Sequence, residues 1–152
     1  MLAVPQENEN TFLRLDCGNS IPEARGKSCL YDVMAAAWVP EPCYQPAVAD
    51  RYLAMHPWKF YADPEGKDEI EIKEVQNGDY VHMWTSNAFH VAYCLYAWER
   101  YLVAIDSGLP VNSQASVAHH AAHCSMFAMN DNITREAVQT EIKVAYFSCP
   151  AE

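Results

Sequence analysis

Two short stretches of this chain place the same chemically active residue types at the same spacing. His90-Val-Ala-Tyr93-Cys94 and His120-Ala-Ala-His123-Cys124 form an internal repeat, in which Tyr93 occupies the position that His123 has in the second copy. On a helix, residues at positions i, i+3 and i+4 share one face about one turn apart. The active side chains of each copy are therefore predicted to point the same way, as metal ligands or as groups that carry protons.

Two helices are needed to carry these copies. The stretch from Asn87 to Asp106 is predicted to be the first, because its apolar residues keep the spacing of one helix face: Phe89, Tyr93, Tyr96, Ala97, Tyr101 and Ala104. Ser107-Gly-Leu-Pro110 is a stop signal, and a second helix is predicted from about Ser113 to Met129. The two helices would form a hairpin.

The geometry of this hairpin predicts one disulfide bond. The midpoint between Cys94 and Cys124 is residue 109, which falls in the turn at Gly108-Leu-Pro110. Two straight antiparallel helices would place both cysteines about 22 Å from the turn, at 1.5 Å per residue. Facing cysteines at equal height can be bridged, so we predict a Cys94–Cys124 disulfide with the histidines clustered beside it.

Three histidines, His90, His120 and His123, are expected to converge in this hairpin. Three imidazoles are a usual site for copper, zinc or non-haem iron, and they leave coordination positions open for oxygen or substrate. An open metal site implies catalysis. The alternative is that these histidines only pack between helices, beside a structural disulfide.

These motifs, with residues upstream of them, resemble the fungal UstYa-like family, whose members are encoded with peptide and polyketide pathways. Upstream of the motifs, the following residues occur in the same order as in a subgroup of these fungal proteins: Cys17-Gly18, Glu23-Ala24-Arg25, Cys29, Asp32, Trp38-Val-Pro40 and Cys43. The resemblance covers most of residues 17–149. The paired motif is its more specific part.

The resemblance implies a copper-dependent tailoring enzyme that oxidises, cyclises, crosslinks or halogenates a small polyketide, terpenoid or peptide substrate. It implies that His90, His120 and His123 bind the metal. We predict that Tyr93, His120 and His123 are the catalytic residues. The family has a histidine where Tyr93 stands. Two interpretations of this substitution remain open: the phenol ligates or neighbours copper, or the protein is a metal-independent cyclase, isomerase or dehydratase in which His120 or His123 is the acid or base.

A third interpretation is a non-catalytic binding protein. The resemblance also raises association with a second copy or with another member of the family, which would donate a ligand to the site. A typical member has a transmembrane helix just upstream of the region where this chain begins. The natural protein is therefore expected either to carry a membrane anchor that is absent from this chain or to be a secreted variant.

The cysteines favour the secretory pathway. Six cysteines without a Cys-x-x-Cys pair suit a disulfide framework, and Asn132-Ile-Thr134 is a glycosylation sequon, predicted to be modified at Asn132. The alternative is a cytosolic protein with six buried thiols. Proximity favours Cys17–Cys29 or Cys29–Cys43, but four cysteines allow three pairings, and the sequence leaves open how Cys17, Cys29, Cys43 and Cys149 are joined.

Composition limits the domain count and the partners. The length of 152 residues suits one domain, predicted over residues 14–150 as a UstYa-like lumenal domain after a flexible tail over residues 1–13. Acidic side chains outnumber basic ones by 20 to 10 without any basic cluster, which excludes nucleic acid as an expected partner. No stretch approaches 18 consecutive apolar residues, the signature of a membrane span.

The predicted fold class is α+β and mainly α: the helical hairpin carrying the two motifs, a small antiparallel β element and disulfide staples. Short helices are predicted over Leu30–Trp38 and Pro46–Met55. Alternation of polar and apolar residues predicts strands over Glu69–Val75 and Thr140–Tyr146, which could pair, although either segment could instead be a helix.

Two further histidines and one charged pair have simpler expectations. His119 points about 100 degrees away from its neighbour His120 on the helix, so it is expected to face solvent or a loop. His82 lies just upstream of the first helix. It is expected to be a buried histidine or, alternatively, a further metal ligand or base. Glu99-Arg100 is predicted to be an exposed charged face.

Overall fold

The computed structural model describes residues 14–111 and 118–150. The helices are α1 (Ile21–Gly26), α2 (Pro46–Ala54), α3 (Ile72–Gln76), α4 (Asn87–Ser107) and α5 (Ala118–Ala128), with a 3-10 turn at Glu41–Cys43. The strands are β1 (Arg14–Asp16), β2 (Leu30–Asp32), β3 (Ala37–Val39), β4 (Phe60–Tyr61), β5 (Glu69–Ile70), β6 (His82–Ser86), β7 (Val138–Lys143), β8 (Ala145–Tyr146) and β9 (Ser148–Pro150). The predicted tail over residues 1–13 lies outside the described residues.

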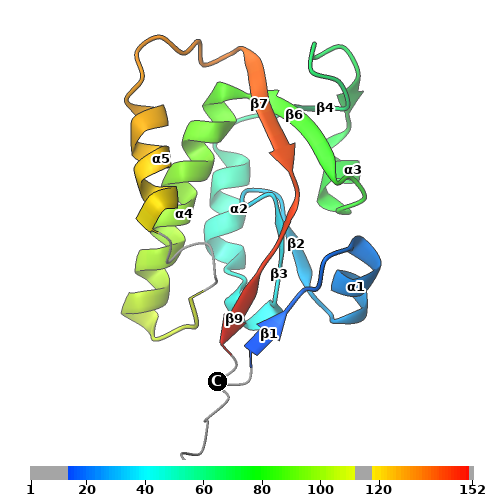
Figure 1. The fold of residues 1–152 in the computed structure, drawn as a ribbon, viewed down its shortest axis with the longest axis vertical. Coiled ribbons are helices and arrows are strands. Elements are labelled where there is room, and N and C mark those ends of the chain that lie inside the picture. The colour runs from blue at the N-terminus through cyan, green and yellow to red at the C-terminus, as the bar shows by residue number, and fades with distance from the viewer. Residues whose placement is uncertain (1–13, 112–117, 151–152) are drawn as a thin grey trace, which may run out of the picture.

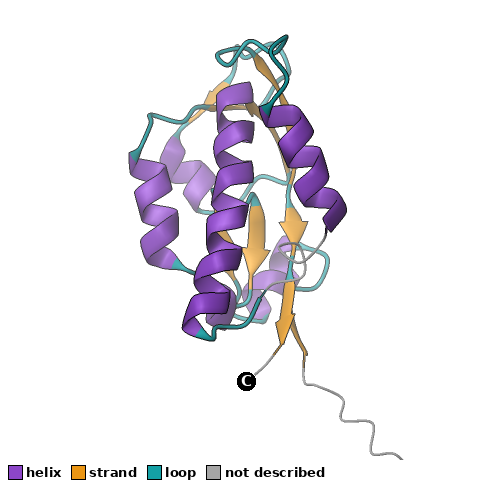
Figure 2. Ribbon diagram, turned by 90° about the vertical axis from the view of Figure 1, so that its left-hand side faces the viewer, coloured by secondary structure: helices purple, strands orange, loops and turns teal. Residues whose placement is uncertain are grey.

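Helices α2, α4 and α5 lie side by side on one side of the molecule, and the strands lie behind them (Figures 1 and 2). Three small sheets have the strand orders β5-β4-β6-β7, β2-β3-β8 and β1-β9. All pairings are antiparallel except β3 with β8. Helices and strands are roughly balanced across the described residues, so the mixed class is confirmed and the predicted mainly α character is wrong.

Helix α4 follows its sequence signals closely. The Ser86 hydroxyl accepts the backbone N–H of Phe89 and caps the first turn. Gly108 ends the helix in the left-handed conformation, with φ of 67°, which glycine adopts without steric cost. The predicted span is confirmed to within one residue, as is the helix beginning at Pro46. The second helix of the hairpin is described from Ala118 onward, and residues 113–117 of its predicted span lie outside the described residues.

The helix predicted over Leu30–Trp38 is wrong, because this segment forms the β2–β3 hairpin. The Asp32 carboxylate accepts the backbone N–H of Ala35 at 3.1 Å, and Ala36 takes the left-handed conformation, with φ of 49°. Residues from Val33 to Val39 are almost all buried. A strand buried on both faces shows no alternation, so the run of alanines resembles a helix.

The strand predicted over Glu69–Val75 is correct only at its start. Strand β5 ends at Ile70, and α3 begins at Ile72. Val75 turns into the main core at 1% exposure, which a helical turn permits. The strand predicted over Thr140–Tyr146 is present as β7 and β8, but β7 pairs with β6 rather than with β5.

One main core lies between the helices and the sheets. Its largest buried members come from both: Met34, Tyr52, Phe60, Met83, Phe89 and Tyr96. A smaller cluster at the α1 end contains Cys17, Ala24, Cys29 and Trp38. Burial of apolar surface at this scale is the main contribution to the stability of the fold.

All six cysteines are paired, as Cys17–Cys29, Cys43–Cys149 and Cys94–Cys124. The last is the bond that the hairpin geometry predicts, and the first two resolve the pairing that the sequence left open. Three disulfides fit a protein of the secretory pathway rather than six thiols in the cytosol. Within residues 14–111 and 118–150, no helix has the length and apolar character needed to cross a membrane.

Candidate functional site

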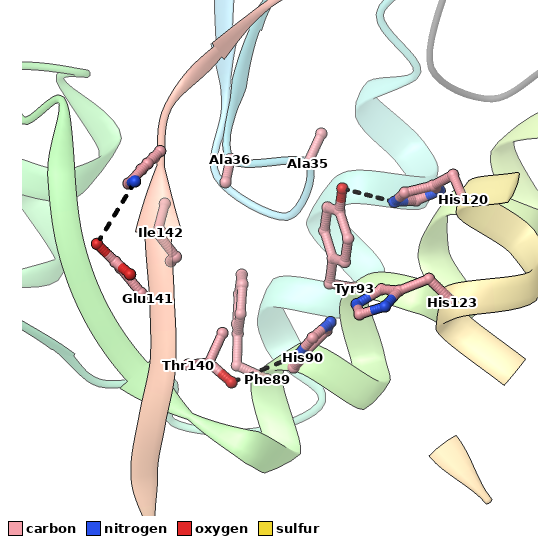
Figure 3. Close-up of a pocket in the computed structure, with 11 residues that line it drawn as sticks. Ala35, Ala36, Phe89, His90, Tyr93, His120, His123, Thr140, Glu141 and Ile142 are labelled. Atoms are coloured by element: carbon pink, nitrogen blue, oxygen red, sulfur yellow. Dashed lines mark hydrogen bonds and ion pairs between the residues drawn. The ribbon is translucent and has the colours of Figure 1, made fainter. Parts of the chain in front are cut away.

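The repeated motifs of α4 and α5 meet at one pocket. The Cys94–Cys124 disulfide joins the two helices at a Cα–Cα distance of 5.4 Å, and the motif side chains lie beside it. The pocket has a volume of about 300 Å³ and is lined by Ala35, Ala36, Phe89, His90, Tyr93, His120, His123, Thr140, Glu141, Ile142 and Lys143 (Figure 3). The structure therefore brings together all four motif side chains singled out in the sequence.

Within the pocket the four side chains are arranged as two pairs. The Tyr93 hydroxyl lies 3.0 Å from His120 Nε2, with the two rings perpendicular. His90 and His123 lie with their ring centroids 5.6 Å apart. Among the residues that the structure describes, no three histidine, cysteine or carboxylate side chains are placed to hold one metal ion together. The three histidines thus line the same pocket, as expected, but they do not converge on one point. Metal binding stays a prediction.

His90 is held from two sides. Its ring stacks on Phe127 at a centroid distance of 3.7 Å and an angle of 26°. Its Nδ1 atom lies 3.5 Å from the Thr140 hydroxyl oxygen. Burial, reinforced by the neighbouring His123 and His120, lowers the pKa of His90 to about 4. The ring is therefore neutral at neutral pH.

His120 is neutral for the same kind of reason. Burial lowers its pKa, with smaller contributions from His123, His119 and Arg100, all of which disfavour a positive charge on the ring. A neutral imidazole has one nitrogen without hydrogen, which accepts a hydrogen bond or binds a metal. His123 is the most exposed of the three and lies on the side of α5 that faces His90 (Figure 3).

The remaining walls of the pocket come from strands. Ala35 and Ala36 belong to the turn between β2 and β3, and β7 contributes Thr140 to Lys143. Ile142 is buried at 5% exposure, whereas Glu141 and Lys143 are exposed on the opposite face of the strand. The strand wall of the pocket is therefore largely apolar, and the Glu141 carboxylate points away from the histidines toward His82 on β6 (Figure 3).

A buried polar network lies behind the Ala35–Ala36 wall. The Tyr96 hydroxyl donates to the Asp32 carboxylate at 2.5 Å, and Arg100 Nη1 lies 4.0 Å from the same oxygen. Asp32 and Arg100 are 1% and 2% exposed, so the prediction that Arg100 lies on an exposed charged face is wrong. Glu99 is partly exposed and pairs with Arg51. The buried carboxylate fixes the turn that forms one wall of the pocket.

Other residues noted in the sequence lie away from the pocket. His82 is exposed on β6, and its Nε2 lies 2.6 Å from the Glu141 carboxylate, so it is neither a buried histidine nor a member of the histidine group. His119 is exposed, as expected. Asn132 is exposed in the loop between α5 and β7, where its side chain is accessible.

Three neighbours of His90 were missed by reasoning from the sequence. Phe127 lies four residues after His123 on α5, so the helical spacing that united the motif could have included it. Thr140 and Asn87 come from β7 and from the first residue of α4, and no local pattern marks them. Their role depends on how the strand docks against the helix.

Comparison with known proteins finds similarity to two proteins of one fungal biosynthesis cluster. The chain is 28% identical over 121 residues to phomopsin biosynthesis cluster protein B and to protein B' of Diaporthe leptostromiformis, covering 73% of this chain and 35% of each relative. It thus spans about a third of the length of these curated relatives. No family model and no solved structure matches the chain. The chain is similar, over most of its length, to proteins of a fungal biosynthesis cluster.

Proposed function

We propose that this chain is a UstYa-like tailoring enzyme that modifies a small molecule or peptide in a fungal biosynthetic pathway. The observation that carries the proposal is the gathering of all four motif side chains at one pocket, with the Tyr93 hydroxyl at 3.0 Å from His120 Nε2. The similarity to phomopsin biosynthesis cluster proteins supports the biosynthetic setting. The three disulfides support a site of action in the secretory pathway, where Asn132 would be glycosylated.

Tyr93 and His120 form the pair best suited to chemistry in this arrangement. Because burial lowers the pKa of His120, the imidazole is neutral near pH 7 and is able to take up a proton. One member of the pair removes a proton from the substrate, and the pair returns a proton to a second substrate atom. Such a transfer leaves the oxidation state unchanged, so the product is an isomer, a ring-closed form or, where water leaves, a dehydrated form.

Copper-dependent oxidation is the second candidate, and the His90–His123 pair favours it. Neutral imidazole nitrogens suit copper, and burial keeps His90 neutral with its ring 5.6 Å from that of His123. His120 is hydrogen-bonded to Tyr93, so a three-histidine ligand set would require His120 to leave that bond, or the Tyr93 oxygen would serve in its place. Bound copper would supply one-electron redox chemistry.

The shape of the pocket supports a small or locally inserted substrate. A volume of about 300 Å³ lies at the lower end of ligand pockets and accommodates one ring system or one side chain of a peptide. Phe89 and Ile142 would contact an apolar portion of the substrate, and Tyr93 and the histidines would meet its polar groups. Polyketides, terpenoids and peptides with an unsaturated or aromatic portion fit this description.

A gene replacement in the native host tests the proposal. Metabolites are compared by mass spectrometry between strains that carry the wild-type gene, a deletion, Tyr93→Phe, His120→Gln or the control Tyr61→Phe, which lies on β4 outside the pocket. Loss of one product and accumulation of its precursor in the deletion, Tyr93→Phe and His120→Gln strains are expected. Identical profiles in the wild-type and deletion strains would refute the enzymatic role.

The masses of precursor and product separate the two chemistries. Equal masses, or a loss of one water, support acid–base catalysis. A loss of two hydrogens or a gain of one oxygen supports oxidation. In the second case, copper retained after loading and desalting should be lost in the His90→Gln/His123→Gln variant and kept in His56→Gln, an exposed histidine outside the pocket.

A further inference from the structure

The buried amide of Asn87 has a fixed orientation. Its Nδ2 atom donates to the backbone carbonyl of Thr134 at 2.9 Å and to the Gln139 side-chain oxygen at 2.8 Å. A backbone carbonyl only accepts hydrogen bonds, so the atom facing it must be the nitrogen. Asn87 is 2% exposed, and its Oδ1 atom therefore has to find its donor within the protein.

That donor is the hydroxyl of Thr140, which lies 3.2 Å from Asn87 Oδ1. A threonine hydroxyl has one hydrogen, and the Asn87 oxygen receives it. The same Thr140 oxygen lies 3.5 Å from His90 Nδ1 and is left as an acceptor. If Thr140 instead donated to His90, a buried carbonyl oxygen would lose its partner, at a cost of about 1–3 kcal/mol.

From this chain of hydrogen bonds we infer that Asn87 and Thr140 are positioning residues that keep the His90 proton on Nδ1 and present Nε2 to the pocket with its lone pair. Stacking on Phe127 fixes the plane of the ring. The edge of the ring that lies away from Thr140 points toward Tyr93 and His123 (Figure 3). The inference rests on the proposed function in one respect: Nε2 of His90 is taken to be the atom that binds a metal ion or accepts a substrate proton. The hydrogen bonds from Asn87 through Thr140 to His90 involve no substrate or metal.

The consequence for either chemistry is a pre-arranged acceptor. A ring with a lone pair on Nε2 is able to bind a metal ion or to accept a substrate proton. A neutral ring protonated at Nε2 has no lone pair directed at the pocket and is able to do neither. Outer partners of this kind change metal affinity or rate by roughly 10- to 100-fold when removed. Thr140→Val is therefore expected to weaken Cu(II) binding or turnover by that factor.

The test is the tautomer of His90, read from the ring nitrogen signals of ¹⁵N-histidine-labelled protein at pH 7. Wild type and Thr140→Ser, which keeps the hydroxyl, are expected to show His90 protonated at Nδ1. Thr140→Val, which is similar in shape and lacks the hydroxyl, is expected to lose this preference. His90→Gln assigns the signals, and backbone amide spectra check that each variant is folded.

Protonation of His90 at Nε2 in the wild type would overturn the inference, as would an unchanged tautomer in Thr140→Val. The wild-type spectrum decides even if the valine variant fails to fold. Because no substrate or metal enters the measurement, its outcome is separate from that of the gene replacement. An Nδ1-protonated ring in a protein whose deletion changes no metabolite would refute the proposed function alone.

Discussion

At the scale of single residues, the environment of His90 is expected to be visible in its titration. Burial lowers its pKa from the ordinary value of 6.5 to about 4. NMR is expected to show one histidine ring that titrates near pH 4 and disappears in His90→Gln. Titration of every ring near 6.5 would contradict the buried placement of this side chain.

The lowered pKa of His90 also makes the free energy of unfolding depend on pH. As pH falls from about 6.5 to about 4, His90 binds a proton in the unfolded chain but not in the folded one, so the free energy of unfolding decreases. Above 6.5 both states are neutral, and this contribution is fully present. His90→Gln is expected to lose less stability than wild type across this pH window, as measured by urea denaturation.

The buried pair Asp32 and Arg100 gives a second prediction at this scale. The three guanidinium nitrogens of Arg100 have no hydrogen-bond partner among the described residues, whereas Asp32 accepts hydrogen bonds from Tyr96 and Ala35. Removing one partner of a buried ion pair typically costs about 3–5 kcal/mol because it leaves an uncompensated charge. Asp32→Asn is expected to destabilise by about that amount.

Arg100→Met is expected to cost less than Asp32→Asn. Burial raises the pKa of Asp32, so the carboxyl is able to take up a proton and become neutral once Arg100 is gone, whereas a guanidinium always stays charged. Denaturant unfolding of the two variants measures the difference. A larger loss in Arg100→Met would show that the arginine is better satisfied than its contacts indicate.

At the scale of elements, one covalent bond joins α5 to α4, in addition to the Phe127–His90 stack and the Tyr93–His120 hydrogen bond. Cys124 is its only buried residue, so the helix has little apolar surface to hold it against α4. The Cys94–Cys124 bond closes a loop with a sequence separation of 30, for which chain entropy suggests a stabilisation of about 3–4 kcal/mol. Cys94→Ser/Cys124→Ser is expected to speed amide hydrogen exchange across Ala118–Ala128 and to return the pKa of His90 toward 6.5.

The matched control is Cys17→Ser/Cys29→Ser, which removes a disulfide of the smaller core cluster at the α1 end. That variant is expected to leave exchange in α5 and the titration of His90 unchanged. Equal effects of both variants would mean that the disulfides act on the whole domain rather than on the helix they join.

The elements also show which parts of the fold could be predicted. Helix α4 has a serine cap, a continuous apolar face and a terminal glycine, and these local signals suffice. Ser20 and Glu23 are a similar signal for α1, where Ser20 accepts the Glu23 backbone N–H, although no helix was predicted there. The β2–β3 hairpin depends instead on Asp32 and on burial from both sides, which are properties of the folded chain.

The candidate site divides in the same way. Helical spacing brought His90, Tyr93, His120 and His123 together, because the site is built on two local repeats. The turn at Ala35 and the strand residue Thr140 reach the pocket only through sheet pairing and long-range packing. Arg100 was misplaced because its charge suggested solvent, while its position on α4 turns it toward Asp32.

At the scale of the whole molecule, the segment from β7 to β9 joins the three sheets. Strand β7 pairs with β6 beside the pocket, β8 pairs with β3, and β9 pairs with β1 (Figure 1). The last strand also contains Cys149, which is bonded to Cys43. One continuous stretch therefore connects the wall of the pocket to the end of the domain where the first and last described strands lie together.

The positions of two disulfides determine how the domain would carry a mechanical load. Force applied at Arg14 and Pro150 passes through the Cys17–Cys29 bond, along the chain to Cys43, and across to Cys149. Residues 44–148 lie outside this path. Single-molecule stretching should therefore extend the oxidised domain by no more than roughly 60–70 Å at about 3.4 Å per residue, with longer extension only after reduction. Tension between the two ends would therefore bypass α4, α5 and β7, but it would act on the turn at Ala35 and Ala36, which forms one wall of the pocket.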